Sequence, residues 1–305
     1  MSFQEQERAL FDLIFDRSLR ADFCRDSSKA LDGYALEDTE REDFETIRPD
    51  ALEMDAKMRV YLLLSQWSQS YPVSFSIVSS LHGGVDALRE MIDQKLMRTP
   101  PIDRIASYGS RLKEWMAAAA FDSEEEKVRA VAILGAEFGM CWAAASLKRA
   151  VVKDAHPGSS QAELPADWLS QPLRFSSYVC AVLIPQSYTQ LKRTLCPCVD
   201  RSFWRDLSKQ PLARAQISEI LQQEDPRLLV TQATVGHASK CEPTVEYQTV
   251  ELSEGFAPLF QHIDGSSNVA FILQQLEAAG AEGVLLNGVE SGFRELVERG
   301  MLEVG

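Results

Sequence analysis

The sequence has few of the residues, and none of the short motifs, on which many enzyme active sites are built. It has only four histidines in 305 residues, and they lie far apart. It has no G-x-S-x-G, G-x-x-x-x-G-K-[ST], G-x-G-x-x-G or H-E-x-x-H segment. These patterns mark serine hydrolases, P-loop nucleotide-binding proteins, dinucleotide-binding enzymes and zinc proteases. The sequence therefore supports none of these four classes.

Basic residues are scarce near the C-terminus. The whole chain carries a net charge of −14. Residues 242–305 hold 11 acidic and only 2 basic residues, a net charge of −9. The phosphate backbone of DNA or RNA repels such a segment. We therefore expect no nucleic-acid partner, and a transcriptional regulator is disfavoured.

Export signals, long apolar runs and a disulfide framework are also missing. The acidic, amphipathic first 20 residues lack the features of a signal peptide. The longest apolar stretches are too short to span a bilayer, and they lie at residues 60–64, 116–121 and 178–185. The six cysteines have no framework spacing. We expect a cytoplasmic protein with reduced thiols and no membrane partner.

Two short segments resemble metal-binding pairs, but each is incomplete. Cys196-Pro197-Cys198 offers at most two soft ligands, and no second pair accompanies it. The pair His262-x-Asp264 needs a further histidine to form an iron site, and none follows it. We therefore predict no catalytic residue, metal site or cofactor in this chain. The alternative is a metal-dependent, peptide-modifying oxygenase that uses Cys196 and Cys198 with a histidine brought near by folding.

The hydrophobic pattern divides the chain into an all-α half and an α+β half. Apolar residues recur at helical spacing through residues 1–153, with strong helices predicted at 54–67, 85–97, 101–121 and 123–152. Residues 154–173 contain three prolines and the run Gly158-Ser159-Ser160, which predicts a linker. The prediction is thus a helical domain at 1–153 that docks a partner, followed by an α+β domain at 174–305.

The second domain mixes strands and helices. Aromatic and β-branched runs predict strands at 175–184, 227–235 and 244–252, with a turn at 236–243. Helical patterns occupy residues 217–223, 255–263, 268–279 and 289–299. In the last strand, Val245, Tyr247 and Thr249 share one face, while Val250 lies on the other. Two strands followed by three helices predict a winged-helix module at about 225–305.

This C-terminal pattern resembles a known peptide-recognition element. The run Leu259-Phe260-x-x-Ile263-Asp264-Gly265-Ser266 is its most specific part. The module is similar to the recognition elements of pathways that make ribosomally synthesised, post-translationally modified peptides (RiPPs), and to the small protein of pyrroloquinoline quinone synthesis. The resemblance implies that an extended peptide pairs with the outer strand, opposite the third helix.

The N-terminal half carries a second resemblance. The residues that carry it are Leu19, Arg20 and Phe23, then Ala30, Leu31, Tyr34 and Leu36, then Glu40, Arg41 and Phe44. They are similar to the small helical domain of protocatechuate 4,5-dioxygenase. Joined to a recognition element, this half resembles the partner subunits of multinuclear non-haem iron oxidases, such as that of the 3-thiaglutamate pathway.

The second resemblance implies a non-catalytic subunit of an oxidase complex. Such a subunit binds a precursor or carrier peptide and presents its cysteine-bearing end to a separate chain, which holds the iron. The two chains are expected to form a heterodimer. The cleft candidates lie on the strand at 244–252 and the helix at 289–299, and the alternative is that they form the module's own core. They are Val245, Tyr247, Thr249, Val250, Phe293 and Leu296.

Overall fold

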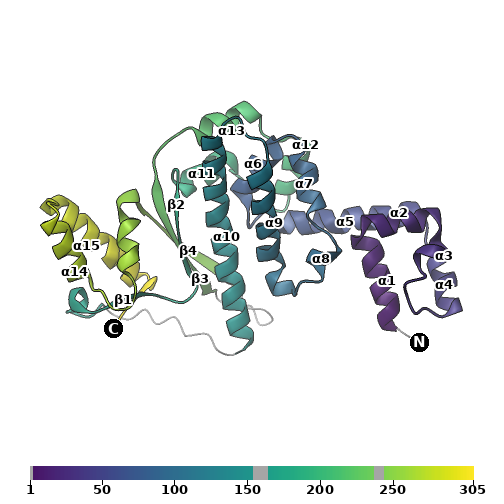
Figure 1. The fold of residues 1–305 in the computed structure, drawn as a ribbon, viewed down its shortest axis with the longest axis horizontal. Coiled ribbons are helices and arrows are strands. Elements are labelled where there is room, and N and C mark those ends of the chain that lie inside the picture. The colour runs from purple at the N-terminus through teal and green to yellow at the C-terminus, as the bar shows by residue number, and fades with distance from the viewer. Residues whose placement is uncertain (1–2, 154–163, 237–243) are drawn as a thin grey trace. The chain divides into compact units, whose positions relative to one another are not determined.

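The computed structural model describes residues 3–153, 164–236 and 244–305 (Figure 1). The fold is mixed α+β and mostly helical, with two small antiparallel sheets. The chain forms two compact units. The first comprises residues 1–120 and 198–214, and the second comprises residues 121–197 and 215–305.

The first unit is entirely helical, as the sequence predicts for most of it. Its central helix is α6 (Pro72–Ser80), in which every residue from Pro72 to Ser79 is buried. Phe75 of α6 lies with its ring centroid 5.9 Å from that of Tyr108 and 5.8 Å from that of Trp204. α7 (Gly84–Glu90) and α12 (Phe203–Lys209) pack against α6. The other helical elements of the unit are α1 (Phe3–Phe15), α2 (Arg17–Arg25), α3 (Ser27–Ala30), α4 (Asp38–Glu45), α5 (Pro49–Trp67), α8 (Gln94–Met97), η1 (Pro101–Asp103) and α9 (Arg104–Ala118).

Buried charges fix the N-terminal helices of this unit. The carboxylate of Asp12 accepts hydrogen bonds from the Tyr34 hydroxyl at 2.9 Å and from Arg98 at 2.9 and 3.0 Å. Arg20 donates to the Leu13 and Ile14 carbonyls at the end of α1, at 3.0 and 2.8 Å. These carbonyls would otherwise lack partners, because the last turn of a helix leaves its acceptors free.

The second unit is built on a three-stranded antiparallel sheet, in the order β2-β3-β4. The strands are β2 (Val179–Ile184), β3 (Arg227–Val235) and β4 (Val245–Ser253). A two-stranded sheet pairs β1 (Leu173–Phe175) with β5 (Leu302–Val304). The helical elements are α10 (Glu124–Val152), η2 (Trp168–Ser170), α11 (Tyr188–Leu195), α13 (Arg214–Leu221), η3 (Glu254–Phe256), η4 (Pro258–His262), α14 (Val269–Ala278) and α15 (Gly283–Glu298).

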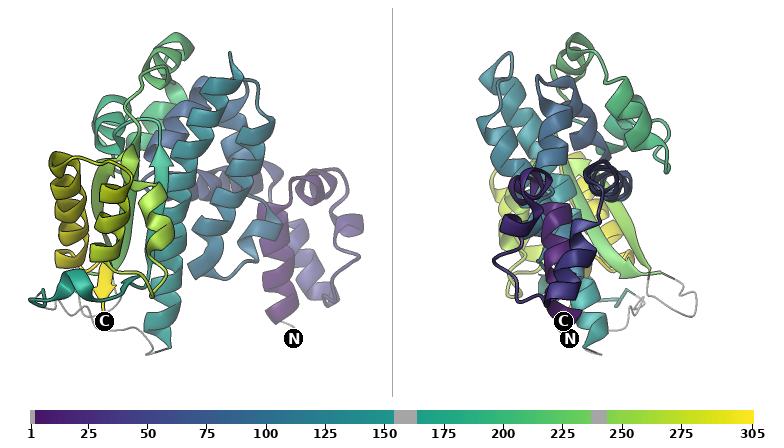
Figure 2. Two further views of the ribbon diagram at one scale, coloured as in Figure 1. Left: turned by 60° about the vertical axis from the view of Figure 1, so that its left-hand side comes forward. Right: turned by 90° about the vertical axis from the view of Figure 1, so that its right-hand side faces the viewer.

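Helices cover both faces of the three-stranded sheet, as Figures 1 and 2 show. α10 packs along β2 and β3 on one face. Its small residues permit this close approach, since a Cβ at Gly139 would lie only 3.1 Å from the Cys180 sulfur. On the other face, α14 and α15 share a hydrophobic core with Val230 and Val250 of the sheet.

The structure corrects the predicted domain boundaries. α10 belongs with the sheet of the second unit, whereas the sequence placed residues 121–153 in the helical domain. Helical periodicity shows that a face is apolar, but it does not show whether a helix or a sheet covers that face. The short segment at residues 198–214 belongs to the first unit instead.

The predicted linker is wrong over residues 164–173. Trp168 is 4% exposed and Leu173 is fully buried, and both belong to the core shared by α14 and α15. Residues 154–163 lie outside the described residues. The predicted strand at 175–184 is split into β1 and β2, because Tyr178 adopts a positive φ of 64° between them.

α10 is long and apolar enough, by length and composition alone, to cross a membrane. The shorter apolar stretches considered in the sequence did not include it. Most of its most apolar window, 61%, is buried inside the protein. Burial of this kind is typical of the core helix of a folded domain.

Candidate functional site

The edge of the three-stranded sheet formed by β4 is available for pairing. Within the part of the chain that the structure describes, β4 pairs only with β3. The Gly236 N–H donates to the Thr244 carbonyl at 2.8 Å, so these opposed residues form a hydrogen-bonded pair. Because such pairs alternate along an antiparallel ladder, every second residue of β4 directs its N–H and C=O away from β3. These outward residues are Val245, Tyr247, Thr249 and Glu251.

The pairing of β3 with β2 supports this assignment. The Ala233 N–H donates to the Tyr178 carbonyl at 3.0 Å, on the β2 side of β3. Ala233 is opposite Tyr247 in the register of β3 and β4. Since Ala233 uses its backbone groups toward β2, its partner Tyr247 is in a non-hydrogen-bonded pair and faces the free edge.

The side chains of these outward residues lie on the face of the sheet that α10 partly covers. Val245 is half-buried against a small cluster that includes Ala143 and Leu147 of α10. Tyr247 is 44% exposed, and Thr249 is exposed. Burial raises the pKa of the Tyr247 hydroxyl, with the thiols of Cys141 and Cys180 contributing. The hydroxyl therefore stays protonated in the alkaline range in which an exposed tyrosine ionises.

The free edge is limited at one end by α11. The side chain of Glu251 accepts hydrogen bonds from the backbone N–H and the hydroxyl of Thr189, at 2.8 and 2.7 Å. This contact holds the first turn of α11 against the end of β4. Glu251 is not among the site residues predicted from the sequence, although the alternation that groups Val245, Tyr247 and Thr249 on one face also includes it.

The other predicted site residues lie on the opposite face, which corrects the predicted cleft. Val250 is 5% exposed, and Phe293 and Leu296 are fully buried in one hydrophobic core. They form the module's own core, which was the alternative interpretation. The cleft between Tyr247 and Phe293 does not exist as predicted, because α15 packs on the other face of the sheet from Tyr247.

The Leu-Phe-x-x-Ile-Asp-Gly-Ser run forms a turn before α14. Asp264 accepts hydrogen bonds from the Ser266 N–H and hydroxyl and from the Ser267 N–H, and these bonds lower its pKa to about 2. Gly265 has a φ of +83°, which favours glycine. Asp264 and Gly265 therefore form a turn, and the side chain of Asn268 caps α14 by accepting a hydrogen bond from the Phe271 N–H. The predicted helix at 255–263 consists of the 3-10 turns η3 and η4.

The two cysteines of the Cys196-Pro197-Cys198 segment have different environments. Cys196 is buried at the end of α11, whereas Cys198 is exposed. A hydrogen bond to Asp200, at 3.6 Å, raises the pKa of the Cys198 thiol. Within the described ranges, no group of three or more His, Cys, Asp or Glu side chains is placed to hold a metal ion.

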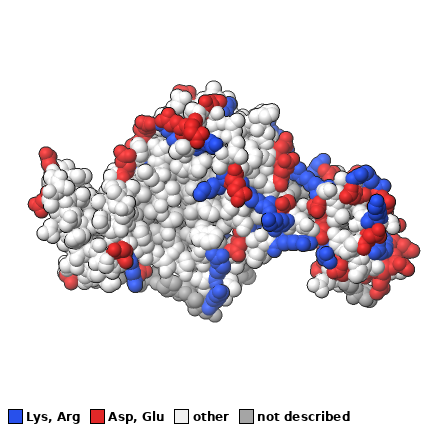
Figure 3. All heavy atoms as spheres, viewed as in Figure 1, with Lys and Arg blue, Asp and Glu red and all other residues white. Residues whose placement is uncertain are grey.

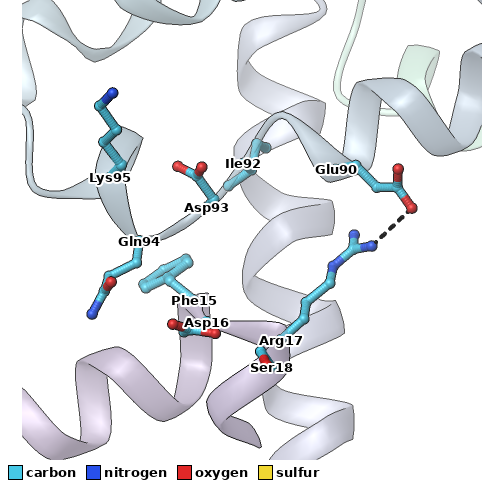
Figure 4. A pocket seen from close by; sticks show the side chains of 9 residues that line it. All are labelled: Phe15, Asp16, Arg17, Ser18, Glu90, Ile92, Asp93, Gln94 and Lys95. Carbon is cyan, nitrogen blue, oxygen red and sulfur yellow. Dashed lines mark hydrogen bonds and ion pairs between the residues drawn. The ribbon is translucent and has the colours of Figure 1, made fainter. Parts of the chain in front are cut away.

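A polar pocket of about 420 Å³ lies between α2 and the segment around α8 (Figure 4). Asp16 caps α2 by accepting from the Leu19 N–H, and Asp93 caps α8 by accepting from the Leu96 N–H. Arg17 and Glu90 form an ion pair at 3.1 Å at its margin. Because both helix N-termini already have a carboxylate, the pocket does not favour an anionic ligand.

Comparisons with known proteins find no match for this chain. No protein family matches it. No curated protein matches it, and no solved structure matches it. Its function therefore has to be inferred from its own residues and geometry.

Proposed function

We propose that this protein is a non-catalytic binding subunit that captures an extended peptide along the free edge of β4. The observation that carries the proposal is the row of outward backbone groups on this nine-residue strand, beside the exposed side chains of Tyr247 and Thr249. An added strand gains affinity from backbone hydrogen bonds and selectivity from alternate side chains. The other edge of the sheet, on β2, is only six residues long.

The peptide that fits this edge is a basic one. Glu246 is an exposed acidic residue on β4, and Glu251 is a second, half-buried one. In Figure 3, the few charged side chains in view over α14 and α15 are Asp and Glu. Complementary charge of this kind speeds association and selects partners more than it increases affinity. We therefore expect Lys or Arg in the bound segment of the peptide.

The arrangement of elements supports a more specific form of the proposal. Within residues of about 225–305, β3 and β4 are followed by η3, η4, α14 and α15, an order that supports a module of two strands followed by helices. On this proposal, residues of about 225–305 form a winged-helix recognition element. The subunit presents the cysteine-bearing end of a precursor or carrier peptide to a separate iron-dependent oxidase. Tethering would raise the effective concentration of the peptide at the iron site without chemistry in this chain.

Calorimetric titration with the short precursor peptide encoded nearest to the gene tests this function. We expect micromolar binding, and about tenfold weaker binding for Tyr247→Lys, because a positive charge beside the added strand must be desolvated and repels a basic peptide. The matched control Val284→Lys changes an exposed residue of α15 and leaves the affinity unchanged. Phe293 is unsuitable for this test, because it is fully buried and its replacement would unfold the core.

The same experiment includes a measurement of how many metal ions the purified chain carries. Absence of peptide binding, together with about one metal ion per chain, would contradict the proposal. That result would favour the metal-dependent oxygenase instead, because a true metal site retains its ion through purification.

A further inference from the structure

A long open groove lies beside α5 in the first unit. It has a volume of about 1080 Å³ and lies between α2 and α5, with Trp204 of α12 at one end. The α5 residues that line it run from Asp50 to Leu64. At 1.5 Å per residue, this stretch is roughly 21 Å long. The groove is larger than most small-molecule sites and matches a helix of three to four turns.

The wall of the groove formed by α5 is an uncovered apolar stripe. Met54, Met58 and Tyr61 follow the i, i+4, i+7 spacing and therefore share one face of the helix. Met54 is 68% exposed and Met58 is 52% exposed. Methionine is flexible and polarizable, so a methionine-rich surface adapts well to an apolar helix. Exposed apolar surface rimmed by charged residues in this way marks an interaction site.

The lining of the groove carries more basic than acidic residues, in contrast to the surrounding sequence. Residues 1–60 hold 16 acidic and 9 basic residues. The groove reverses this balance, because four Lys or Arg residues but only two acidic residues line it. Figure 3 shows Lys and Arg side chains gathered around α5. A partner with acidic side chains would complement this rim.

Three of these basic residues are able to exchange their present partners. Arg17 pairs with Glu90 at 3.1 Å, Lys57 with Glu53 at 3.2 Å, and Arg89 with Asp86 at 3.1 Å. All three basic side chains are exposed, and ion pairs between exposed side chains contribute little to stability. The fourth basic residue, Arg20, is buried and donates hydrogen bonds to the end of α1. It therefore lies in the wall of the groove and is not part of the exposed rim.

We infer that this groove binds an acidic amphipathic helix of a partner protein. The apolar face of that helix lies on Met54, Met58 and Tyr61, and its acidic residues meet Arg17, Lys57 and Arg89. The inference does not depend on peptide capture at β4, because all groove residues belong to the first unit.

The test uses three synthetic 16-residue peptides and the full-length chain. The first has leucines at i, i+3, i+4 and i+7 spacing, with glutamate and alanine elsewhere. The second has the same composition with the leucine face scrambled, and the third has lysine in place of glutamate. We expect the first peptide to bind at least about tenfold more tightly than either of the others, as measured by fluorescence anisotropy.

Variants locate the binding surface in the same assay. Met54→Glu and Met58→Glu replace exposed side chains, so both should fold, and each should weaken binding about tenfold. Val284→Glu, in the second unit, leaves binding unchanged. The inference would be overturned if the three peptides bound equally well, or if the acidic peptide did not bind at millimolar concentration. It would also be overturned if both methionine variants bound the acidic peptide as tightly as the wild type. A further contradicting result would be a wild-type chain that is dimeric in solution and a Met58→Glu variant that is monomeric. The groove would then hold a second copy of this chain.

Discussion

Replacing Gly84 with alanine is expected to destabilise the first unit by about 3 kcal/mol. Gly84 is the first residue of α7, and it follows Gly83, which has a φ of +71°. A Cβ at residue 84 would overlap the carbonyl oxygen of Val78 and lie 2.7 Å from its carbonyl carbon. The obstacle is backbone rather than a flexible side chain, so α6 and α7 would have to separate.

Separation of these helices is costly because α6 forms the centre of the unit. Val78 is fully buried, and its carbonyl already accepts a hydrogen bond from the Leu81 N–H at 3.0 Å. Urea unfolding followed by circular dichroism measures the resulting decrease in the free energy of unfolding. Gly33→Ala is the matched control, because a Cβ at residue 33 meets nothing within 4 Å. If the free energy of unfolding of Gly84→Ala lies within about 0.5 kcal/mol of that of the wild type, α6 and α7 do not approach each other as closely as described.

Replacing Thr249 with proline is expected to weaken peptide binding by between about tenfold and a hundredfold. The Thr249 N–H points to the free edge, so proline removes a donor to the peptide but no hydrogen bond to β3. The peptide carbonyl opposite is then left without a partner, which costs about 1–3 kcal/mol. Edge strands tolerate proline where the N–H faces outward. We therefore expect little change in the free energy of unfolding.

The neighbouring residue gives the contrasting variant. Gln248 forms a hydrogen-bonded pair with Gln232 of β3, so Gln248→Pro breaks the ladder inside the sheet. It should lower stability as well as binding, whereas Thr249→Pro should lower binding alone. Unchanged affinity of Thr249→Pro in calorimetry, or a loss of stability equal to that of Gln248→Pro, would contradict the assigned pattern of the edge.

The strands that flank the candidate site could be predicted well from the sequence. The alternating runs at 227–235 and 244–252 correspond to β3 and β4 within one residue at each end. The helices α13 and α14 also lie where the hydrophobic pattern predicts them. Turn residues and strand alternation are local properties, so one segment carries enough information to specify them.

The layers around the sheet could not be predicted in the same way. Alternation groups Val245, Tyr247 and Thr249 on one face, but it does not show which helix covers that face. The structure places α10 there, and α15 on the opposite side with Val250 and Phe293. Such pairings depend on contacts between residues that are far apart in the chain.

The α5 groove shows the same limit in the first unit. The sequence places Met58, Tyr61, Leu62 and Leu64 on or near one helical stripe, which is typical of a core-facing helix. In the structure Leu64 is buried, but Met58 remains exposed. A stripe of apolar residues indicates that something covers it, and only the fold shows that the described residues of this chain leave part of it exposed.

Hydrogen exchange of the β4 amides, followed by NMR with and without the precursor peptide, tests strand addition most directly. Strand addition predicts an alternating result. The outward amides of Tyr247 and Thr249 become protected when the peptide binds, while those of Gln248 and Val250 are already protected by β3. Peptide binding that leaves the Tyr247 and Thr249 amides exchanging as in the free protein would contradict the account and place the peptide elsewhere.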